Sequence, residues 1–123
     1  MQVNVIVLQS NPEVAQYLQT SLQNHFGHIQ LARNLGEAKA AIPKYRAQIL
    51  VLDLEMVPRS EVEWLRREFP GVCLVCTHRL ADEEMWQEMV GAGASDLCFP
   101  ADSRGILSAA LRSTRASAKA IAA

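Results

Sequence analysis

Residues 47–58 read AQILVLDLEMVP, and this stretch decides the fold. Four consecutive apolar residues, 49–52, run without alternation into Asp53. A short run that is apolar on both sides is typical of a strand buried on both faces, as in a parallel sheet. In open parallel sheets, ligands bind at the carboxyl ends of the strands. The stretch therefore predicts a central strand with a functional site around Asp53.

Four other runs in the chain have the length and composition of strands. Residues 28–32 (HIQLA) alternate apolar and polar side chains, which indicates a strand near an edge of the sheet. The other three runs are residues 3–8 (VNVIVL), 72–76 (VCLVC) and 96–99 (DLCF). Together with the central stretch, these runs predict five strands.

Helices are predicted between the strands, because capping residues precede apolar residues at helical spacing. In the first helix, Val14, Leu18 and Leu22 would form the buried face. The predicted amino-terminal caps are Asn11, Asn34, Ser60, Asp82 and either Asp102 or Ser103. The predicted ends lie at Gly27, just after Phe26, then at Pro43, at Pro70 and at either Gly91 or Gly93.

Strands alternate with helices five times along the chain, and the connections are short. This order predicts an α/β fold in which a parallel sheet is covered by helices on both faces. From about Ser113 the chain is rich in Ala and Ser with scattered bases. We therefore expect one domain at residues 1–112, followed at residues 113–123 by a helix extension or the start of a linker.

Composition excludes several classes of function. The formal net charge of −1 provides no electrostatic footprint for direct contact with nucleic acid or an anionic membrane. No apolar run reaches transmembrane length and the amino terminus lacks the basic start of a signal peptide, so we expect a cytoplasmic protein. An odd number of cysteines in apolar surroundings indicates buried, reduced thiols. Cys73 and Cys76 have redox spacing, but a strand would direct them to opposite faces.

The chain resembles the receiver domains of two-component response regulators from residue 3 to Arg112. The resemblance rests on LVLDLEMVP in the third predicted strand, on VCTHR at the end of the fourth, and on GAGASD at residues 91–96. It implies a flavodoxin-like (βα)5 sandwich with a parallel five-stranded sheet in the order 2-1-3-4-5. In that order the switch point lies between strands one and three.

The resemblance also assigns roles to individual positions. Receivers carry a phosphoacceptor Asp and a switch Ser or Thr, which match Asp53 and Thr77. They also carry two acids after strand one that hold Mg²⁺, a Lys after strand five, and an aromatic switch residue shortly before that Lys. These remaining positions are occupied here by Gln9, Ser10, Pro100 and Leu97, so four of the six differ from the family pattern. The glycine usual after the acceptor strand is also missing from VPRSEVE.

These replacements bear directly on phosphoryl transfer, which depends on positioning and on neutralising charge. A single carboxylate is a weak Mg²⁺ site, because Gln9 and Ser10 offer only neutral oxygens. Losing one charge clamp can cost on the order of several kcal/mol of transition-state stabilisation. We therefore expect an atypical receiver, or pseudo-receiver, that is not an enzyme and holds neither a metal nor a cofactor.

Each candidate at the pocket has a functional and a structural interpretation. Asp53 is either an acceptor or a carboxylate that accepts hydrogen bonds from nearby backbone or Ser10. Thr77 either relays a signal by swinging inward or satisfies loop backbone.

Charged residues near the pocket leave similar alternatives. Glu55 and Glu13 either replace the missing acids or face solvent. His78, Arg79 and Arg59 either place positive charge over the pocket, where a guanidinium could pair with Asp53, or are solvated loop residues.

The helix after Asp82 carries the main candidate for a partner surface. Met85, Met89 and Val90 would form its inner stripe, and Trp86 would point away from the centre of that stripe. In the family, the fourth helix, fifth strand and fifth helix form the dimer and output surface. Trp86 and Leu97 are therefore interface candidates for a homodimer, a protein partner or an output domain.

Three functions compete on this basis. The first is a signalling module that acts by protein contact without phosphorylation. The second is a working receiver with a rebuilt pocket, phosphorylated on Asp53 by a histidine kinase. The third is a flavodoxin-type ligand binder or an enzyme, and the sequence disfavours it: residues 9–12 (QSNP) form no phosphate cradle, and there is no G-x-G-x-x-G or P-loop.

Overall fold

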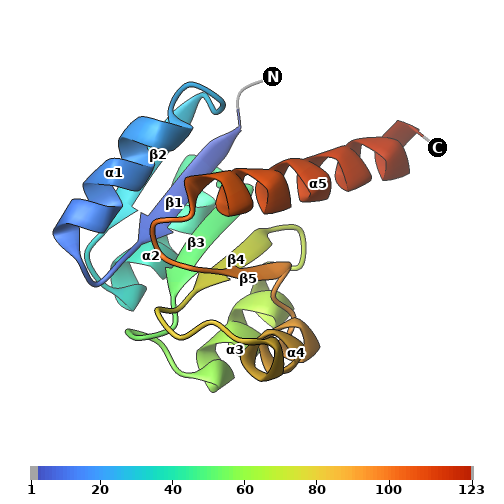
Figure 1. Cartoon of the computed structure of the whole chain (residues 1–123). Helices are drawn as coiled ribbons and strands as arrows, with labels where there is room; N and C mark the ends of the chain where they lie inside the picture. Colours follow the sequence, from blue (N-terminus) through green and yellow to red (C-terminus); the bar gives the residue numbers. More distant parts are fainter. Residues whose placement is uncertain (1–2, 123) are drawn as a thin grey trace.

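The computed structural model describes residues 3–122, with side chains for residues 3–113. Strands and helices alternate along the chain, as the sequence predicts (Figure 1). The strands are β1 (Asn4–Leu8), β2 (His28–Ala32), β3 (Ile49–Asp53), β4 (Cys73–Thr77) and β5 (Asp96–Cys98). The helices are α1 (Pro12–Leu22), α2 (Leu35–Tyr45), α3 (Arg59–Glu68), α4 (Glu83–Ala92) and α5 (Ser103–Ala122).

The five strands form one parallel sheet in the order β2-β1-β3-β4-β5. This confirms the predicted flavodoxin-like order and places β2 at an edge. In the register of the sheet, Asp53 at the end of β3 is level with Thr77 at the end of β4. Leu8 at the end of β1 is level with Leu52, one residue before the end of β3. The topology therefore brings the carboxyl ends of β1, β3 and β4 together.

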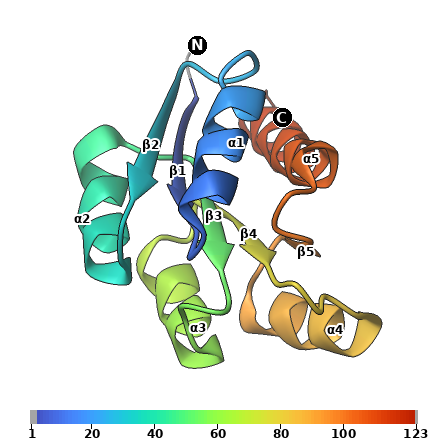
Figure 2. The same ribbon diagram turned by 60° about the vertical axis from the view of Figure 1, so that its left-hand side comes forward.

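Helices cover both faces of the sheet, which explains why its central strands are apolar on both sides. Helices α1 and α5 lie on one face, and α2, α3 and α4 lie on the other (Figure 2). Every residue of β3 and β4 is buried. Leu50 and Leu52 face the side of α2, α3 and α4, while Ile49 and Val51 face α1 and α5. No helix in the described part of the chain is long and apolar enough to span a membrane.

The capping predictions hold for four of the five helices. The side chains of Asn11, Asn34 and Asp82 accept hydrogen bonds from backbone N–H groups in the first turns of α1, α2 and α4, at 2.8 to 2.9 Å. Between the two candidates for α5, Asp102 is the cap, because its Oδ1 accepts from Gly105 N at 3.0 Å.

The prediction for α3 is wrong. Ser60 lies inside the helix, which begins one residue earlier after Pro58 and has no side-chain cap. The extended backbone of Pro58 starts the helix instead, and its carbonyl accepts from Glu61 N at 3.0 Å.

Two predicted helix ends are wrong for identifiable reasons. Helix α1 ends at Leu22, before Phe26, because the chain turns back so that Phe26 is buried in the core and Gly27 N donates to Val3 O. Helix α2 continues past Pro43 to Tyr45. Pro43 is exposed in the last turn of the helix, and α2 ends at Tyr45, before the left-handed backbone of Arg46.

Two predicted buried faces each include one residue that the structure does not fully bury, while Leu18, Leu22 and Met89 are buried as predicted. In α1, Ala15 is buried with Leu18 and Leu22, whereas Val14 is only half-buried. In α4, Met89 and Ala92 are buried, whereas Val90 is 36% exposed. One helical position is a rotation of about 100°, which is enough to move a side chain off the inner stripe.

Gly93 ends α4 in the left-handed conformation, with φ of 113°. Arg66 of α3 packs against it: Arg66 Nε donates to Gly93 O at 2.8 Å, and a Cβ on Gly93 would lie 2.6 Å from Arg66 Cγ. The sequence prediction that α4 ends at a glycine is therefore confirmed for Gly93. The structure adds that this glycine also permits the close approach of α3.

We expect Gly93→Ala to destabilise the protein by about 1–3 kcal/mol, because it adds a left-handed alanine and a clash with Arg66. Gly91 is the matched control: it lies in the same helix, and a Cβ there meets nothing within 4 Å. Gly91→Ala should be neutral or stabilising by up to about 1 kcal/mol. Urea unfolding of both variants measures the difference, and equal effects at the two positions would contradict this explanation.

Candidate functional site

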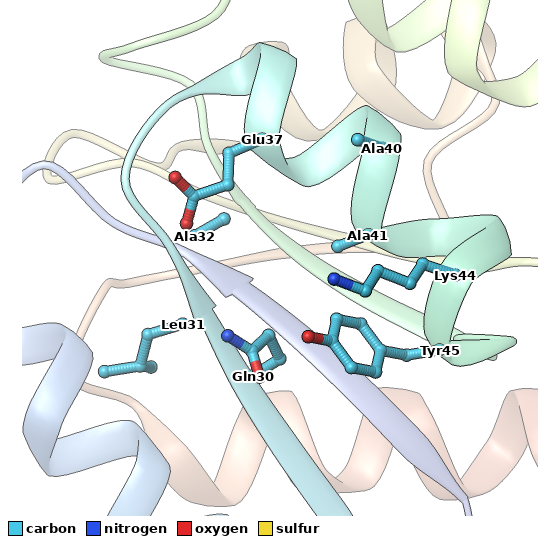
Figure 3. Close-up of a pocket in the computed structure, with 8 residues that line it drawn as sticks. All are labelled: Gln30, Leu31, Ala32, Glu37, Ala40, Ala41, Lys44 and Tyr45. Carbon is cyan, nitrogen blue, oxygen red and sulfur yellow. The ribbon is translucent and has the colours of Figure 1, made fainter.

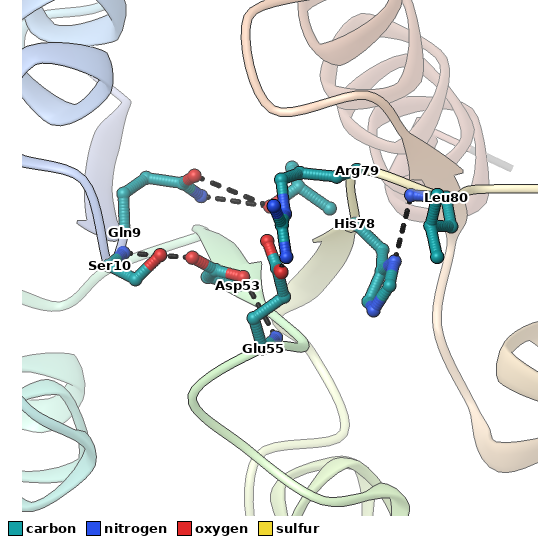
Figure 4. Close-up of polar contacts among 8 residues, drawn as sticks. Gln9, Ser10, Asp53, Glu55, His78, Arg79 and Leu80 are labelled. Atoms are coloured by element: carbon teal, nitrogen blue, oxygen red, sulfur yellow. Dashed lines mark hydrogen bonds and ion pairs between the residues drawn. The ribbon is translucent and has the colours of Figure 1, made fainter.

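Asp53 lies at the carboxyl end of β3 and is only 2% exposed. Both of its carboxylate oxygens accept backbone hydrogen bonds: Ser10 N donates to Oδ2 at 2.8 Å and Glu55 N donates to Oδ1 at 2.8 Å (Figure 4). Hydrogen bonds to a charged acceptor are about twice as strong as neutral ones, so this pair compensates the buried charge. The arrangement matches the structural interpretation of Asp53, in which nearby backbone and Ser10 satisfy the carboxylate.

Gln9 and Thr77 form a second buried contact beside Asp53. Gln9 Nε2 donates to Thr77 Oγ1 at 3.0 Å, and Thr77 Oγ1 lies 3.4 Å from Gln9 Oε1. The two residues are 7% and 0% exposed. Because β3 lies between β1 and β4, the Gln9 side chain reaches across the end of β3 to make this contact. The structural interpretation of Thr77 is that its hydroxyl satisfies loop backbone. The structure shows instead that the hydroxyl contacts the Gln9 side chain.

Arg79 places positive charge at the pocket, but its partner is Glu55. Arg79 Nε lies 2.6 Å from Glu55 Oε1, while the Arg79 side chain is 75% exposed. The Glu55 side chain is only 21% exposed. Of the two alternatives for Arg79, the structure shows a largely exposed loop side chain that pairs with Glu55 and not with Asp53. Ion pairs with one exposed partner contribute little to stability, about 0–1 kcal/mol, so this one mainly fixes position.

The other charged candidates lie away from the pocket. His78 Nδ1 accepts a hydrogen bond from Leu80 N at 2.9 Å, and Figure 4 shows its ring on the Leu80 side, away from Asp53. Arg59 pairs with Glu63 and Glu88 on α3 and α4. Glu13 is exposed. None of His78, Arg59 and Glu13 lines the hollow at Asp53.

That hollow has a volume of about 330 Å³. It is lined by Gln9, Ser10, Asn11, Val14, Asp53, Glu55, Arg79 and Pro100. All three positions at which the family has charged residues other than the acceptor, Gln9, Ser10 and Pro100, therefore border the hollow in the fold.

The residues of the hollow do not fit Mg²⁺. Mg²⁺ binds hard oxygen ligands in octahedral geometry and usually takes one or two carboxylates. Each oxygen of Asp53 accepts one backbone hydrogen bond and keeps a further lone pair. The second acid in the described lining, Glu55, is paired with Arg79, so Asp53 is the one unpaired carboxylate there. Within the described part of the chain, no group of three or more His, Cys, Asp or Glu side chains is placed to hold a metal ion.

The interface candidates separate clearly in the structure. Leu97 is 9% exposed and packs in the core, and it also lines a hollow beside Trp86. Its role as an interface residue stays a prediction. Trp86 is 44% exposed. The sequence analysis missed Phe99 and Leu80, which are 53% and 71% exposed. Phe99 was assigned to the fifth strand, but β5 ends one residue earlier and leaves it outside the sheet.

The cysteines are structural. Cys76 and Cys73 belong to the cores on opposite faces of the sheet, as predicted, and neither forms a disulfide. Burial raises the pKa of the Cys76 thiol to about 12. Burial, followed by the nearby Asp96 carboxylate, raises the pKa of Cys98 to about 12. Both thiols are therefore protonated at neutral pH, and the thiolate is the reactive form.

A second hollow lies between β2 and α2, at the opposite edge of the sheet from β5 (Figure 3). Its volume is about 220 Å³ and its walls include Ala32, Ala41, Lys44 and Tyr45. The Lys44 ammonium lies 5.3 Å from the centre of the Tyr45 ring, so its charge is directed at the wall of the hollow. The volume is below the range of about 300–1,000 Å³ typical of ligand pockets. We assign it no function.

We expect a favourable coupling between Gln9 and Thr77, because each satisfies a polar group that the other would leave buried and unpaired. In a double-mutant cycle with Gln9→Ala and Thr77→Val, the coupling in the free energy of unfolding should be about 0.5–1.5 kcal/mol. Thr20 is exposed on α1 and serves as the control hydroxyl. Thr20→Val should show no coupling with Gln9→Ala beyond about 0.5 kcal/mol. Additive effects of Gln9→Ala and Thr77→Val would contradict the contact.

No protein-family model matches the chain, and no curated protein matches it significantly. Solved structures do match. The amino-terminal signal receiver domain of a two-component system response regulator from Bacteroides fragilis superposes with a TM-score of 0.81 at 19% identity, over 92% of this chain and 97% of that one. The receiver domain of the Francisella response regulator 1452 gives 0.78 at 20% identity, over 93% and 98%.

The isolated receiver domain of RcsB from Salmonella enterica gives a TM-score of 0.73 at 16% identity, over 88% of this chain and 87% of that one. These similarities span nearly the whole of each domain. The superpositions establish the architecture. At identities this low, the chemistry of the site has to be argued from the residues of this chain. The chain therefore has the flavodoxin-like fold of response-regulator receiver domains.

Proposed function

We propose that the chain is a receiver-like module of two-component signalling that works by protein–protein contact, without magnesium-dependent phosphorylation of Asp53. The observation that carries this proposal is the environment of Asp53. Its two oxygens are engaged by Ser10 N and Glu55 N, and the described residues that line the hollow include neither a second free carboxylate nor a lysine. On this proposal the domain is a signalling module and not an enzyme.

Charge decides between this proposal and a working receiver. A phosphoryl group attached to Asp53 would place a charge of about −2 at a buried position. Among the described residues, the one cation lining the hollow is Arg79, whose side chain is 75% exposed and paired with Glu55. Removing a single transition-state donor typically costs about 2.7–4 kcal/mol, and here both the divalent ion and the ammonium would be missing. The missing divalent ion and the missing ammonium would each remove a contribution of this kind, so autophosphorylation from small donors is disfavoured.

The Gln9–Thr77 contact supports the same proposal. In the family, the hydroxyl at the end of strand four responds to the phosphoryl group. Here the Thr77 hydroxyl already has a buried partner in Gln9, and the carbonyl of Thr77 accepts from Leu54 N at 2.9 Å. We infer that the connection from β4 to α4 is held in one conformation without a phosphoryl group.

The signal would then pass through the face formed by α4, β5 and α5. Exposed apolar side chains on soluble proteins mark interaction sites when they gather in one place. Trp86 and Val90 on α4 and Phe99 after β5 are such residues. A second copy of the chain, an output domain and a histidine kinase are the partners that the resemblance suggests for this face.

The test is an amide NMR spectrum of the ¹⁵N-labelled chain with Mg²⁺ and either acetyl phosphate or beryllofluoride. We expect no saturable shifts at Asp53, Thr77 or their neighbours. A variant with Gln9→Asp, Ser10→Asp and Pro100→Lys rebuilds the family pattern and serves as the positive control. It should bind Mg²⁺, because two further carboxylates then face the hollow.

Saturable shifts around Asp53 in the natural sequence would contradict the proposal. So would a phosphorylated species on a phosphate-affinity gel that is absent from Asp53→Ala. Either result would favour the alternative, a functional receiver phosphorylated on Asp53 by a histidine kinase.

A further inference from the structure

A hollow of about 300 Å³ lies at the end of β5, between the first turns of α4 and α5. It is separate from the hollow at Asp53, and the two share no lining residue. Trp86 and Phe99 contribute aromatic rings to its walls, and Asp82, Glu83 and Asp102 contribute carboxylates. The rest of the lining is formed by Ala81, Leu97 and Cys98.

The aromatic wall is held in place while remaining open to solvent. Trp86 Nε1 donates to Asp96 Oδ1 at 3.0 Å, and Arg112 donates to Asp96 Oδ2 at 2.7 Å. Asp96 therefore fixes the indole of α4 to β5 and α5. Trp86 and Phe99 nonetheless stay 44% and 53% exposed. An oriented, exposed aromatic ring loses little conformational entropy on binding, which favours recognition.

The negative charge of the carboxylates in the hollow is only partly offset by the protein. Asp82 and Asp102 each use one oxygen to cap a helix, and Glu83 follows in the first turn of α4. No ion pair joins any of the three to a base within the described residues. The two helix amino termini offset about half a charge each. Three carboxylates against about one positive charge leave the hollow negative.

We propose that this hollow binds the guanidinium of an arginine carried by a segment of a partner protein. The proposal rests on the proposed function, because it specifies the chemistry of the partner at the α4–β5–α5 face. A guanidinium is planar and stacks on aromatic rings, while its N–H groups reach carboxylates in the same plane. An ammonium lacks this planar fork, so lysine should bind more weakly.

The test uses two short peptides of the same shape, acetyl-Gly-Arg-Gly-amide and acetyl-Gly-citrulline-Gly-amide. Citrulline keeps the planar side chain and removes its charge. The readout is the indole N–H of Trp86 in ¹⁵N NMR spectra, assigned with Trp86→Phe. We expect a saturable shift with the arginine peptide that weakens as salt rises. The citrulline peptide should bind more weakly by about two- to fivefold for each carboxylate with which the arginine pairs.

Matched variants assign the binding to the hollow. Asp82→Asn and Asp102→Asn keep the helix caps, because Asn caps as well as Asp, but remove the charge. Combined with Glu83→Gln, they should abolish the difference between the two peptides. Glu68→Gln, an exposed acid on α3, should leave binding unchanged. Unchanged amide shifts elsewhere establish that the variants fold.

Three results of the peptide titrations would overturn the proposal: equal binding of both peptides to the natural sequence, a preference for arginine that survives the triple variant, or binding without a Trp86 shift. A concentration-dependent dimer that Trp86→Ala dissociates would also overturn it, since a second copy would then cover the hollow. The result is independent of Asp53, because the peptide titration needs no phosphate or metal. If Asp53 accepts phosphate and the arginine peptide still binds, the proposed function fails and this site stands.

Discussion

The buried carboxylate of Asp53 is the constraint on which the site depends. A charged group that is 2% exposed must be hydrogen-bonded or it destabilises the fold. Asp53 meets this requirement with two backbone N–H groups, one from the connection after β1 and one from the connection after β3. The carboxylate therefore ties both connections to the end of β3.

The neighbouring polar groups are paired among themselves. Gln9 binds Thr77, and Glu55 binds Arg79. Each of these side chains is engaged within the domain, and Pro100 stands at the position that the resemblance assigns to a lysine. The fold of receiver domains is kept, and on the proposed function this set of contacts takes the place of the metal and phosphate chemistry of the family.

The fold was predictable because its signals are local. The apolar run before Asp53 identifies a central strand, and the caps Asn11, Asn34 and Asp82 act within three residues of themselves. The errors came where a distant contact outweighs a local preference. Helix α1 ends before Phe26, whose side chain is buried in the core. Helix α2 continues to Tyr45, two residues past Pro43.

The sequence indicates where the site lies in the fold, but not which of its side chains pair with each other. The sequence placed Gln9, Thr77 and Arg79 near Asp53, since each follows a strand of the same sheet. The sequence does not reveal that the Gln9 side chain crosses the end of β3 to contact Thr77, or that Arg79 pairs with Glu55. Those choices depend on side-chain rotamers across 24 to 68 residues of sequence separation, which no local pattern encodes. Likewise, the exposure of Phe99 depends on β5 ending one residue early.

On the proposed function, the residues described around Asp53 do not hold a divalent ion together with a phosphoryl group. The most direct measurement is a crystal structure of the chain grown with Mg²⁺ and beryllofluoride. The account predicts that Asp53 keeps its hydrogen bonds from Ser10 N and Glu55 N, and that Gln9 stays on Thr77. Beryllofluoride bound to Asp53 with a magnesium ion beside it, and Gln9 displaced from Thr77, would contradict the account.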